Sequence, residues 1–142
     1  MKKIILDTNI IVSAAIAKGY SRKIVRTILF QELFEVCITQ AILDEYEKVS
    51  LYTRIQKKHP EFKQNILEII TSLSDLFNTY TPAKKFSIIK DISDNIFLDL
   101  AHEAKAHYII TGNKNDFSIT EFEQTKIVSP KKFCELYESN NL

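Results

Sequence analysis

The aspartate Asp7 stands directly after the first apolar run of the chain, residues 4–6. Such a run is typical of a strand that is covered on both faces, as in a parallel sheet. In open α/β sheets, chemistry gathers beyond the carboxyl ends of the strands, which is where this carboxylate falls. Thr8 and Asn9 follow it with short hydrogen-bonding side chains that can orient it. The alternative is a turn aspartate that caps the next segment, and this motif alone does not separate the two.

Two further acids lie at the inner margins of predicted helices. Glu45 is at the edge of the apolar face of a helix that we predict to follow Thr39. Asp94 opens a later helix, where the N-terminal dipole stabilises a negative charge, and helical spacing puts it on the inner side. A surface glutamate and an ordinary helix cap are the alternatives. Asp91 is either that cap or a second acid of the loop.

A fourth group of polar side chains follows the predicted strand 108–111. Thr111, Asn113 and Asp116 lie at or just after its end. Because the carboxyl ends of parallel strands meet at one edge of a sheet, we expect these side chains near Asp7. The alternative is a polar turn, since Gly-Asn is an ordinary turn dipeptide.

Taken together, these side chains form a cluster of carboxylates and amides at one rim of a parallel sheet. Like charges a few ångströms apart are unfavourable unless a cation neutralises them. Oxygen ligands without histidine or thiolate favour hard ions, Mg²⁺ or Mn²⁺. Such ions serve phosphodiester hydrolysis, because they generate hydroxide and stabilise the leaving oxygen. The set therefore points to a metal-dependent hydrolase that acts on phosphodiester bonds.

Strands and helices alternate along the chain as an α/β fold requires. Ser21 and Thr39 are predicted helix caps, and Pro130 is predicted to open a terminal helix. The predicted strands are residues 4–6, 34–38, 76–80, 108–111 and 126–128. The 142 residues suit one domain with one substantial core and a mainly parallel sheet.

The composition excludes several classes of protein. A formal net charge of +1 gives no global field that demands nucleic acid, and two glycines exclude a Gly-rich phosphate loop. Two distant cysteines and three histidines without ligand spacing argue against a disulfide scaffold or a zinc site. Asp7 and Asn9 interrupt the apolar N-terminal segment, and no other stretch reaches transmembrane length without charges. We therefore expect a cytoplasmic protein without membrane contact.

Four segments of the chain resemble the acidic motifs of PIN-domain proteins in order and separation. They are LDTN at 6–9, ILDEY at 42–46, DNIFLDLA at 94–101 and ITGNK at 110–114. The resemblance covers nearly the whole chain, with residues 52–78 the least diagnostic part, and it is closest to the VapC-type toxins of toxin–antitoxin systems. It implies a single domain, residues 1–142, folded as a three-layer α/β/α sandwich with a mainly parallel five-stranded sheet.

The resemblance also implies a metal-dependent ribonuclease that is directed at single-stranded RNA. It gives Asp7, Glu45 and Asp94 the role of ligands for Mg²⁺ or Mn²⁺. One ion is expected between Asp7 and Asp94, with a looser second ion near Glu45. The side chains with supporting polar roles are Thr8 or Asn9, and Thr111.

The chain departs from the family at Asn113, where members often have an aspartate. An amide there can ligate a metal or orient its water, but it removes one negative charge and so weakens a second metal site. Asp116 is near enough in the sequence to substitute for it. We therefore keep Asn113 among the catalytic candidates and do not interpret the departure as a loss of activity.

Binding of the RNA strand is expected to rest on basic side chains near the rim, which act through charge rather than through base recognition. The candidates are Lys18, Arg22, Lys23 and Lys114, and the alternative for each is a solvated basic surface. The resemblance implies two protein partners as well. They are a small antitoxin that covers the acidic cleft and a second copy of the chain in a homodimer.

Three other functions compete with this interpretation. A phosphotransferase of the haloacid-dehalogenase kind needs a second aspartate two residues after the first, where this chain has Asn9. A receiver domain is disfavoured because no clear phosphoacceptor and downstream lysine arrangement accompanies Asp7. A degenerate PIN domain that binds RNA or a protein without catalysis stays open, because Asn113 removes an acid from the site.

Overall fold

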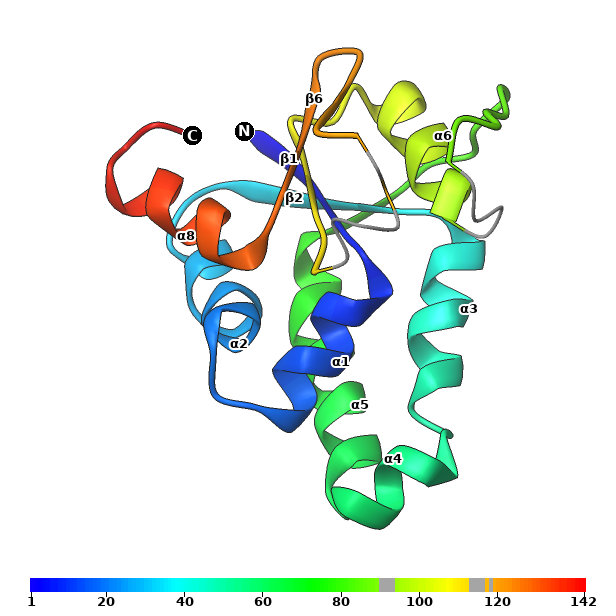
Figure 1. Ribbon diagram of the computed structural model, residues 1–142, viewed down its shortest axis with the longest axis vertical. Helices are drawn as coiled ribbons and strands as arrows, with labels where there is room; N and C mark the ends of the chain where they lie inside the picture. The colour runs from blue at the N-terminus through cyan, green and yellow to red at the C-terminus, as the bar shows by residue number, and fades with distance from the viewer. Residues whose placement is uncertain (90–93, 113–116, 118) are drawn as a thin grey trace.

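The computed structural model describes residues 1–89, 94–112, 117 and 119–142, and these residues build one mainly parallel sheet of six strands (Figure 1). The strand order is β3-β2-β1-β4-β6-β5, and only the β5–β6 pair is antiparallel. The strands are β1 (Lys2–Leu6), β2 (Phe34–Ile38), β3 (Phe77–Thr79), β4 (Tyr108–Ile110), β5 (Glu121–Phe122) and β6 (Thr125–Val128). The predicted α/β class with a mainly parallel sheet is thus confirmed.

The apolar run of the first strand explains its central place in the sheet. Ile4, Ile5 and Leu6 are fully buried, and β1 pairs with β2 on one side and β4 on the other. A strand in that position has helices over both faces, so neither face tolerates polar side chains. The sequence pattern therefore fixes β1 as an interior strand, with its carboxyl end at Asp7.

The sheet has one strand more than the five that the sequence predicts. The extra strand, β5, is two residues long and joins β6 through a hairpin turn in which Glu123 has a left-handed backbone (φ 53°). His102 on the neighbouring helix pairs with Glu123, with 2.9 Å between ring nitrogen and carboxylate oxygen. A two-residue strand leaves no hydrophobic period in the sequence, so periodicity could not predict it.

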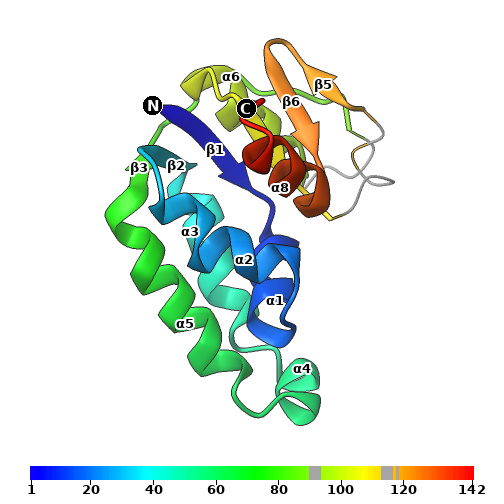
Figure 2. The same cartoon turned by 90° about the vertical axis from the view of Figure 1, so that its left-hand side faces the viewer.

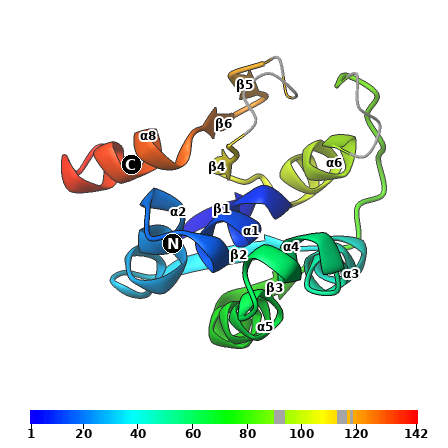
Figure 3. The same ribbon diagram turned by 60° about the horizontal axis from the view of Figure 1, so that its bottom comes forward.

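Helices cover the sheet in two layers (Figure 3). From β1 the chain moves to β2 and then β3 on one side of the sheet, and then returns across it to β4 on the other side of β1. Because such connections are right-handed, the helices α1, α2 and α5 of the first part lie on one face and α6 of the return lies on the other. In agreement, α6 contacts β1 and β2, while α1, α2 and α5 contact one another and α8 contacts α2. The helices are α1 (Thr8–Ile16), α2 (Tyr20–Arg26), α3 (Gln40–Val49), α4 (Thr53–Lys58), α5 (Phe62–Leu73), α6 (Asn95–Ala104) and α8 (Pro130–Glu138). None of the described helices is long and apolar enough to cross a membrane.

Of the helix starts predicted at Ser21, Thr39 and Pro130, two agree with the structure. Thr39 caps α3, because its hydroxyl accepts a hydrogen bond from the N–H of Ile42 (3.1 Å), and Pro130 is the first residue of α8. The predicted cap at Ser21 is wrong. α2 begins at Tyr20 with Gly19 in the cap position, and Ser21 is buried within the first turn. Glycine is accepted at this position almost as well as serine.

The extended segment 80–89 is attached to α6 through Asn95, which is buried (5% exposed). The amide oxygen of Asn95 accepts hydrogen bonds from the N–H groups of Ile88 (3.1 Å) and Ile89 (2.8 Å). Its amide nitrogen donates to the carbonyl of Ile89 (2.9 Å). One side chain therefore satisfies three backbone groups beside the start of α6.

Two acids on the same side of α6 continue this attachment. Asp99 accepts from the N–H of Phe86 (2.7 Å), and Glu103 accepts from the N–H of Ala83 (3.2 Å). Helical spacing assigns both acids to the face turned away from the core, and the structure shows that this face receives the backbone of segment 80–89. The four-residue spacing from Asn95 through Asp99 to Glu103 stacks the three acceptors along one side of the helix.

Replacing Asn95 with alanine is expected to lower the free energy of unfolding by about 2 kcal/mol, because two N–H groups and one carbonyl lose their partner. Asp99→Asn is the control, since the amide keeps an acceptor for Phe86 and is expected to cost well under about 1 kcal/mol. Urea denaturation followed by circular dichroism measures both. Equal, small losses in the two variants would show that Asn95 does not hold the segment.

Candidate functional site

The candidate site lies where the order of the strands reverses. The chain leaves β1 toward β2 on one side, while β4 is the neighbour on the other side, with Leu6 beside Ile110. Ligands bind at such switch points, outside the carboxyl ends of the strands. Asp7 is the first residue after β1 and Thr111 the first after β4. Two residues 104 positions apart in the sequence are therefore brought to one point by strand pairing alone.

The contact between these two residues is a buried hydrogen bond. The hydroxyl of Thr111 donates to Oδ2 of Asp7 at 2.7 Å, and the exposed fractions of the two residues are 0% and 4%. The N–H of Asp7 also donates to the carbonyl of Ile110 at 3.0 Å. The Thr111 side chain and the backbone hydrogen bond of Asp7 thus fix the direction of the carboxylate.

Burial dominates the electrostatics of Asp7. Loss of hydration raises the pKa of its carboxyl above the ordinary value, and the nearby charge of Glu45 raises it further. The Thr111 hydroxyl and the backbone amides of Thr8 and Asn9 lower the pKa but do not compensate. An ionised Asp7 is therefore costly here, and a cation beside it would be strongly stabilising.

Helix α3 brings Glu45 to this carboxylate, and Tyr46 holds the helix there. Glu45 is half-buried, while Tyr46 is completely buried and donates its hydroxyl to the carbonyl of Leu6, one residue before Asp7. Burial raises the pKa of the Tyr46 phenol, and the charges of Asp7 and Glu45 raise it further. The sequence motifs give Tyr46 no role of its own. A tyrosine on a buried face needs an acceptor for its hydroxyl, and that requirement was the signal.

Asp94 occupies the N-cap position of α6 and is half-buried. The first turns of α1, α3 and α6 lie on the same side of the molecule (Figures 1 and 3). Within the described ranges, no three His, Cys, Asp or Glu side chains are arranged to hold one metal ion. The assignment of Asp7, Glu45 and Asp94 as a common ligand set therefore stays a prediction.

The residues around Asp7 nevertheless suit a hydrated divalent ion. The Thr8 hydroxyl, in a residue 7% exposed, is the one buried polar side-chain atom to which the described residues offer no hydrogen-bond partner. Mg²⁺ keeps several of its waters when it binds proteins, and such a water would satisfy this hydroxyl. Asn9, the other supporting candidate, is exposed in the first turn of α1. The Asp7 carboxylate would bind the cation, and the Thr8 hydroxyl would form a hydrogen bond to one of its waters.

Four predicted site residues lie outside the residues that the structure describes. They are Asp91, Asn113, Lys114 and Asp116. Their proposed roles in the site and in RNA binding stay predictions from the sequence.

The other predicted RNA contacts lie at the far end of α1 rather than at the rim. Lys18, Arg22 and Lys23 line a cleft of about 570 Å³ together with Arg26 and Asn65. The nine residues of α1 separate this cleft from Asp7 by about 13 Å, at 1.5 Å per residue. The structure therefore groups these cations with one another and not with the candidate acids.

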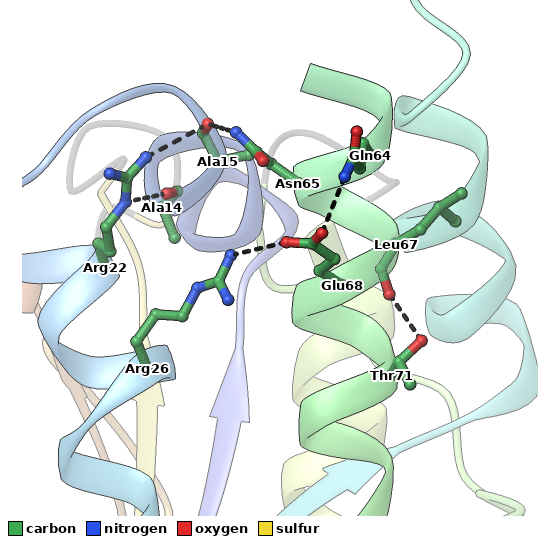
Figure 4. Close-up of polar contacts among 9 residues, drawn as sticks. All are labelled: Ala14, Ala15, Arg22, Arg26, Gln64, Asn65, Leu67, Glu68 and Thr71. Atoms are coloured by element: carbon green, nitrogen blue, oxygen red, sulfur yellow. Dashed lines mark hydrogen bonds and ion pairs between the residues drawn. The ribbon is translucent and has the colours of Figure 1, made fainter. Parts of the chain in front are cut away.

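Within this cleft, Arg22 forms hydrogen bonds with backbone carbonyls at the C-terminal end of α1 (Figure 4). Its Nε donates to the carbonyl of Ala14 (2.8 Å) and its Nη2 to that of Ala15 (3.4 Å), while Asn65 of α5 donates to Ala15 as well (3.0 Å). These carbonyls are among the groups that a helix C-terminus leaves without partners. Arg22 thus has a structural task in addition to any role in RNA binding.

Two further cations of the cleft are engaged in ion pairs. Lys23 pairs with Glu138 of α8, at 2.5 Å between nitrogen and oxygen. Arg26 pairs with Glu68 of α5 at 3.7 Å (Figure 4). These acids reduce the net charge that the cleft presents to a polyanion.

The chain is similar to a known protein family and to a known protein. Residues 3–115 match the sequence profile of the PIN domain family. The chain is also 30% identical, over 145 aligned residues, to an uncharacterized protein of Methanocaldococcus jannaschii, and the alignment covers 96% of this chain and 92% of that relative. The matched profile spans β1 to β4 and therefore includes Asp7, Glu45, Asp94 and Thr111.

Replacing Asp7 with asparagine is expected to raise the melting temperature of the metal-free protein near neutral pH. Burial raises the pKa of this carboxyl in the folded state, so the neutral form favours folding and this contribution is lost as the pH rises through the folded pKa. The gap between variant and parent should be widest near pH 7 and narrow below about pH 4, the unfolded pKa of aspartate. Calorimetry in EDTA across this range measures it.

Glu47→Gln, at an exposed acid of α3, is the control and should leave the melting temperature unchanged. If the parent were more stable than Asp7→Asn in EDTA at neutral pH, the ionised carboxylate would already be satisfied by the protein itself. A cation would then not be needed to stabilise the ionised carboxylate of Asp7.

Proposed function

The chain belongs to the PIN domain family, and from that premise we propose that it is a divalent-metal-dependent endoribonuclease that cleaves single-stranded RNA. PIN domains are generally nucleases, so the family supports hydrolysis of phosphodiester bonds in nucleic acid. The observation that carries the proposal is the Asp7 carboxylate, which Thr111 orients and whose pKa is raised by burial and, to a smaller extent, by the charge of Glu45. Such an arrangement is costly in a purely structural role and is useful as an anionic site for a cation.

In this proposal Asp7, Asp94 and Glu45 hold Mg²⁺ or Mn²⁺. When bound, the ion would supply a nucleophilic water at neutral pH and offset charge on the scissile phosphate. Thr111 fixes the direction of the Asp7 carboxylate, and Tyr46 fixes the distance between α3 and the end of β1. Both are positioning residues, which act through the acids that they hold.

The number of ions follows from the acids that are present. With Asn113 in place of an aspartate, the site has one negative charge fewer. Mg²⁺ bound by one or two carboxylates retains its waters and needs no fourth acid. We therefore propose one well-held ion near Asp7 and Asp94, and weaker binding near Glu45.

The biological role that we propose is that of the toxin in a toxin–antitoxin pair, with a small antitoxin over the acidic site and a homodimer as the assembly. The support is the similarity of the four motifs to VapC-type toxins. A short antitoxin gene adjacent to the gene of this protein would strengthen that role, whereas an isolated gene would favour general RNA processing.

A second candidate is a degenerate PIN domain that binds RNA or a protein without cutting. The observation in its favour is that the described acids are not arranged as the ligands of one ion. Binding of Mn²⁺ in solution separates the two candidates, because a module without catalysis needs no metal.

Cleavage of labelled single-stranded RNA in Mg²⁺, Mn²⁺ or EDTA tests the proposal. Asp7→Asn and Asp94→Asn are each expected to reduce the metal-dependent rate at least about a hundredfold, because they remove charges that the ion needs. Glu47→Gln is the control and should cut as the parent does. Metal-dependent cutting by Asp7→Asn at the parent rate would contradict the assignment. A parent that neither cuts nor binds Mn²⁺ would favour the second candidate.

Thr111→Val is expected to weaken Mn²⁺ binding about 10- to 100-fold, the usual effect of losing a partner of a metal ligand. Thr111→Ser keeps the hydroxyl that contacts Asp7 and should restore most of the affinity. Titration calorimetry with Mn²⁺ measures both. Equal affinities in the valine variant and the parent would show that the Asp7–Thr111 hydrogen bond does not serve the metal.

A further inference from the structure

One part of the chain concentrates positive charge that the candidate site does not use. Residues 51–63, which we call the α4 arm, hold α4, the turn after it and the first residues of α5. The cations of the arm are Arg54, Lys57, Lys58 and Lys63, and its one acid is Glu61. The arm therefore has a net charge of +3 in a chain whose net charge is only +1.

The arm lies at the end of the molecule that is farthest from the sheet (Figures 1 and 2). Helix α3 connects it to the candidate site, because Glu45 lies within that helix and the arm begins just beyond its end. Leu51, the first residue of the arm, follows Glu45 by six residues, which corresponds to about 9 Å along a helix, and the cations of the arm lie farther along the chain. A strand that passes the candidate acids could therefore reach the arm within a few nucleotides.

The arm has a fixed shape although α4 buries none of its residues. The side chain of Gln56 donates to the carbonyl of Ser50 at 2.8 Å, which ties α4 to the end of α3. The N–H of Tyr52 donates to the carbonyl of Val49 at 3.1 Å, and Phe62 is completely buried at the start of α5. The outer side chains are thus presented from an ordered backbone.

The charges of the arm are available to a partner. In the described parts of the chain, none of the arm's four cations takes part in an ion pair, in contrast to Lys23 and Arg26 of the cleft at α1. Two large exposed apolar side chains, Leu51 (59% exposed) and Tyr52 (46% exposed), belong to the same segment. An exposed aromatic ring in a segment of unpaired cations matches a polyanion with accessible bases, because phosphates bind the cations and bases stack on the ring.

We propose that the α4 arm binds the single-stranded RNA that extends from the candidate site, with Arg54, Lys57 and Lys58 at phosphates and Tyr52 against a base. This inference rests on the proposed ribonuclease function and names the surface that holds the substrate strand. Because its cations form no ion pairs among the described residues, the arm takes the main RNA contact in place of the cleft of Lys18, Arg22 and Lys23, which Glu61 of the arm also lines. Charge complementarity favours RNA over a neutral or basic protein surface.

Fluorescence anisotropy of a labelled single-stranded RNA in EDTA tests the proposal, because the strand stays uncut without metal. The variant Arg54→Gln/Lys57→Gln/Lys58→Gln is expected to bind at least about tenfold more weakly than the parent. Its slope of log affinity against log salt should fall by about 2, since each single-strand phosphate contact contributes about 0.7. The matched control is Lys126→Gln/Lys131→Gln/Lys132→Gln, at exposed lysines of β6 and α8 away from the arm (Figure 1). This control should bind within about twofold of the parent.

Tyr52→Leu separates stacking from charge. It keeps an apolar side chain and is expected to bind single-stranded RNA about tenfold more weakly, while its binding to duplex RNA stays unchanged. Thermal melting of all variants checks that they are folded. Because the arm cations and Tyr52 are exposed, the melting temperatures should match that of the parent.

The proposal is overturned if the arm variant binds RNA as the parent does, if the control loses as much affinity, or if the parent does not bind. It is also overturned if the arm variant changes only the sedimentation of the protein, since the arm would then contact a second copy. Cleavage in Mg²⁺ is scored separately. A parent that cuts RNA independently of the arm contradicts only the arm, and a parent that binds through the arm without cutting contradicts only the ribonuclease.

Discussion

The burial of one carboxylate at the carboxyl end of the central strand is the constraint on which the rest of the structure depends. Asp7 is placed there because β1 is fully apolar and therefore interior, which leaves the next residue at the switch point of the sheet. The parallel pairing of β1 with β4 then supplies Thr111 as its hydrogen-bond partner. The strand order that buries the apolar core therefore also buries the carboxylate of Asp7 at the candidate site.

Other buried polar groups hold the elements that carry the remaining acids. Tyr46 joins α3 to the backbone just before Asp7, and Thr39 sets where that helix begins. Asn95 attaches the segment 80–89 to the start of α6, next to Asp94. Each of these side chains forms a hydrogen bond to a backbone group. Their common effect is to keep the starts of α3 and α6 in fixed positions relative to the sheet.

The sequence predicts those features that rest on local pattern, and it misses those that rest on tertiary contacts. The apolar run before Asp7 and the alternation of strands and helices predicted the α/β class and the place of the first acid. Helix α1 was not predicted, because its half-buried positions Val12 and Ile16 are as apolar as its buried residues 10, 11, 14 and 15, so the sequence shows no amphipathic period. The partner of the Tyr46 hydroxyl, the backbone held by Asn95 and the distance of Lys18 from Asp7 all depend on contacts between distant segments. No sequence period reports such contacts.

We propose that the buried carboxylate of Asp7 holds a divalent cation. An anomalous difference map from a crystal of the protein grown with Mn²⁺ tests this most directly. We expect one strong peak at about 2.1 Å from an oxygen of Asp7, the distance typical of small divalent ions and carboxylates, with Asp94 also in contact. A fully ordered Asp7 without such a peak, at a pH where Mn²⁺ binds carboxylates, would contradict the claim.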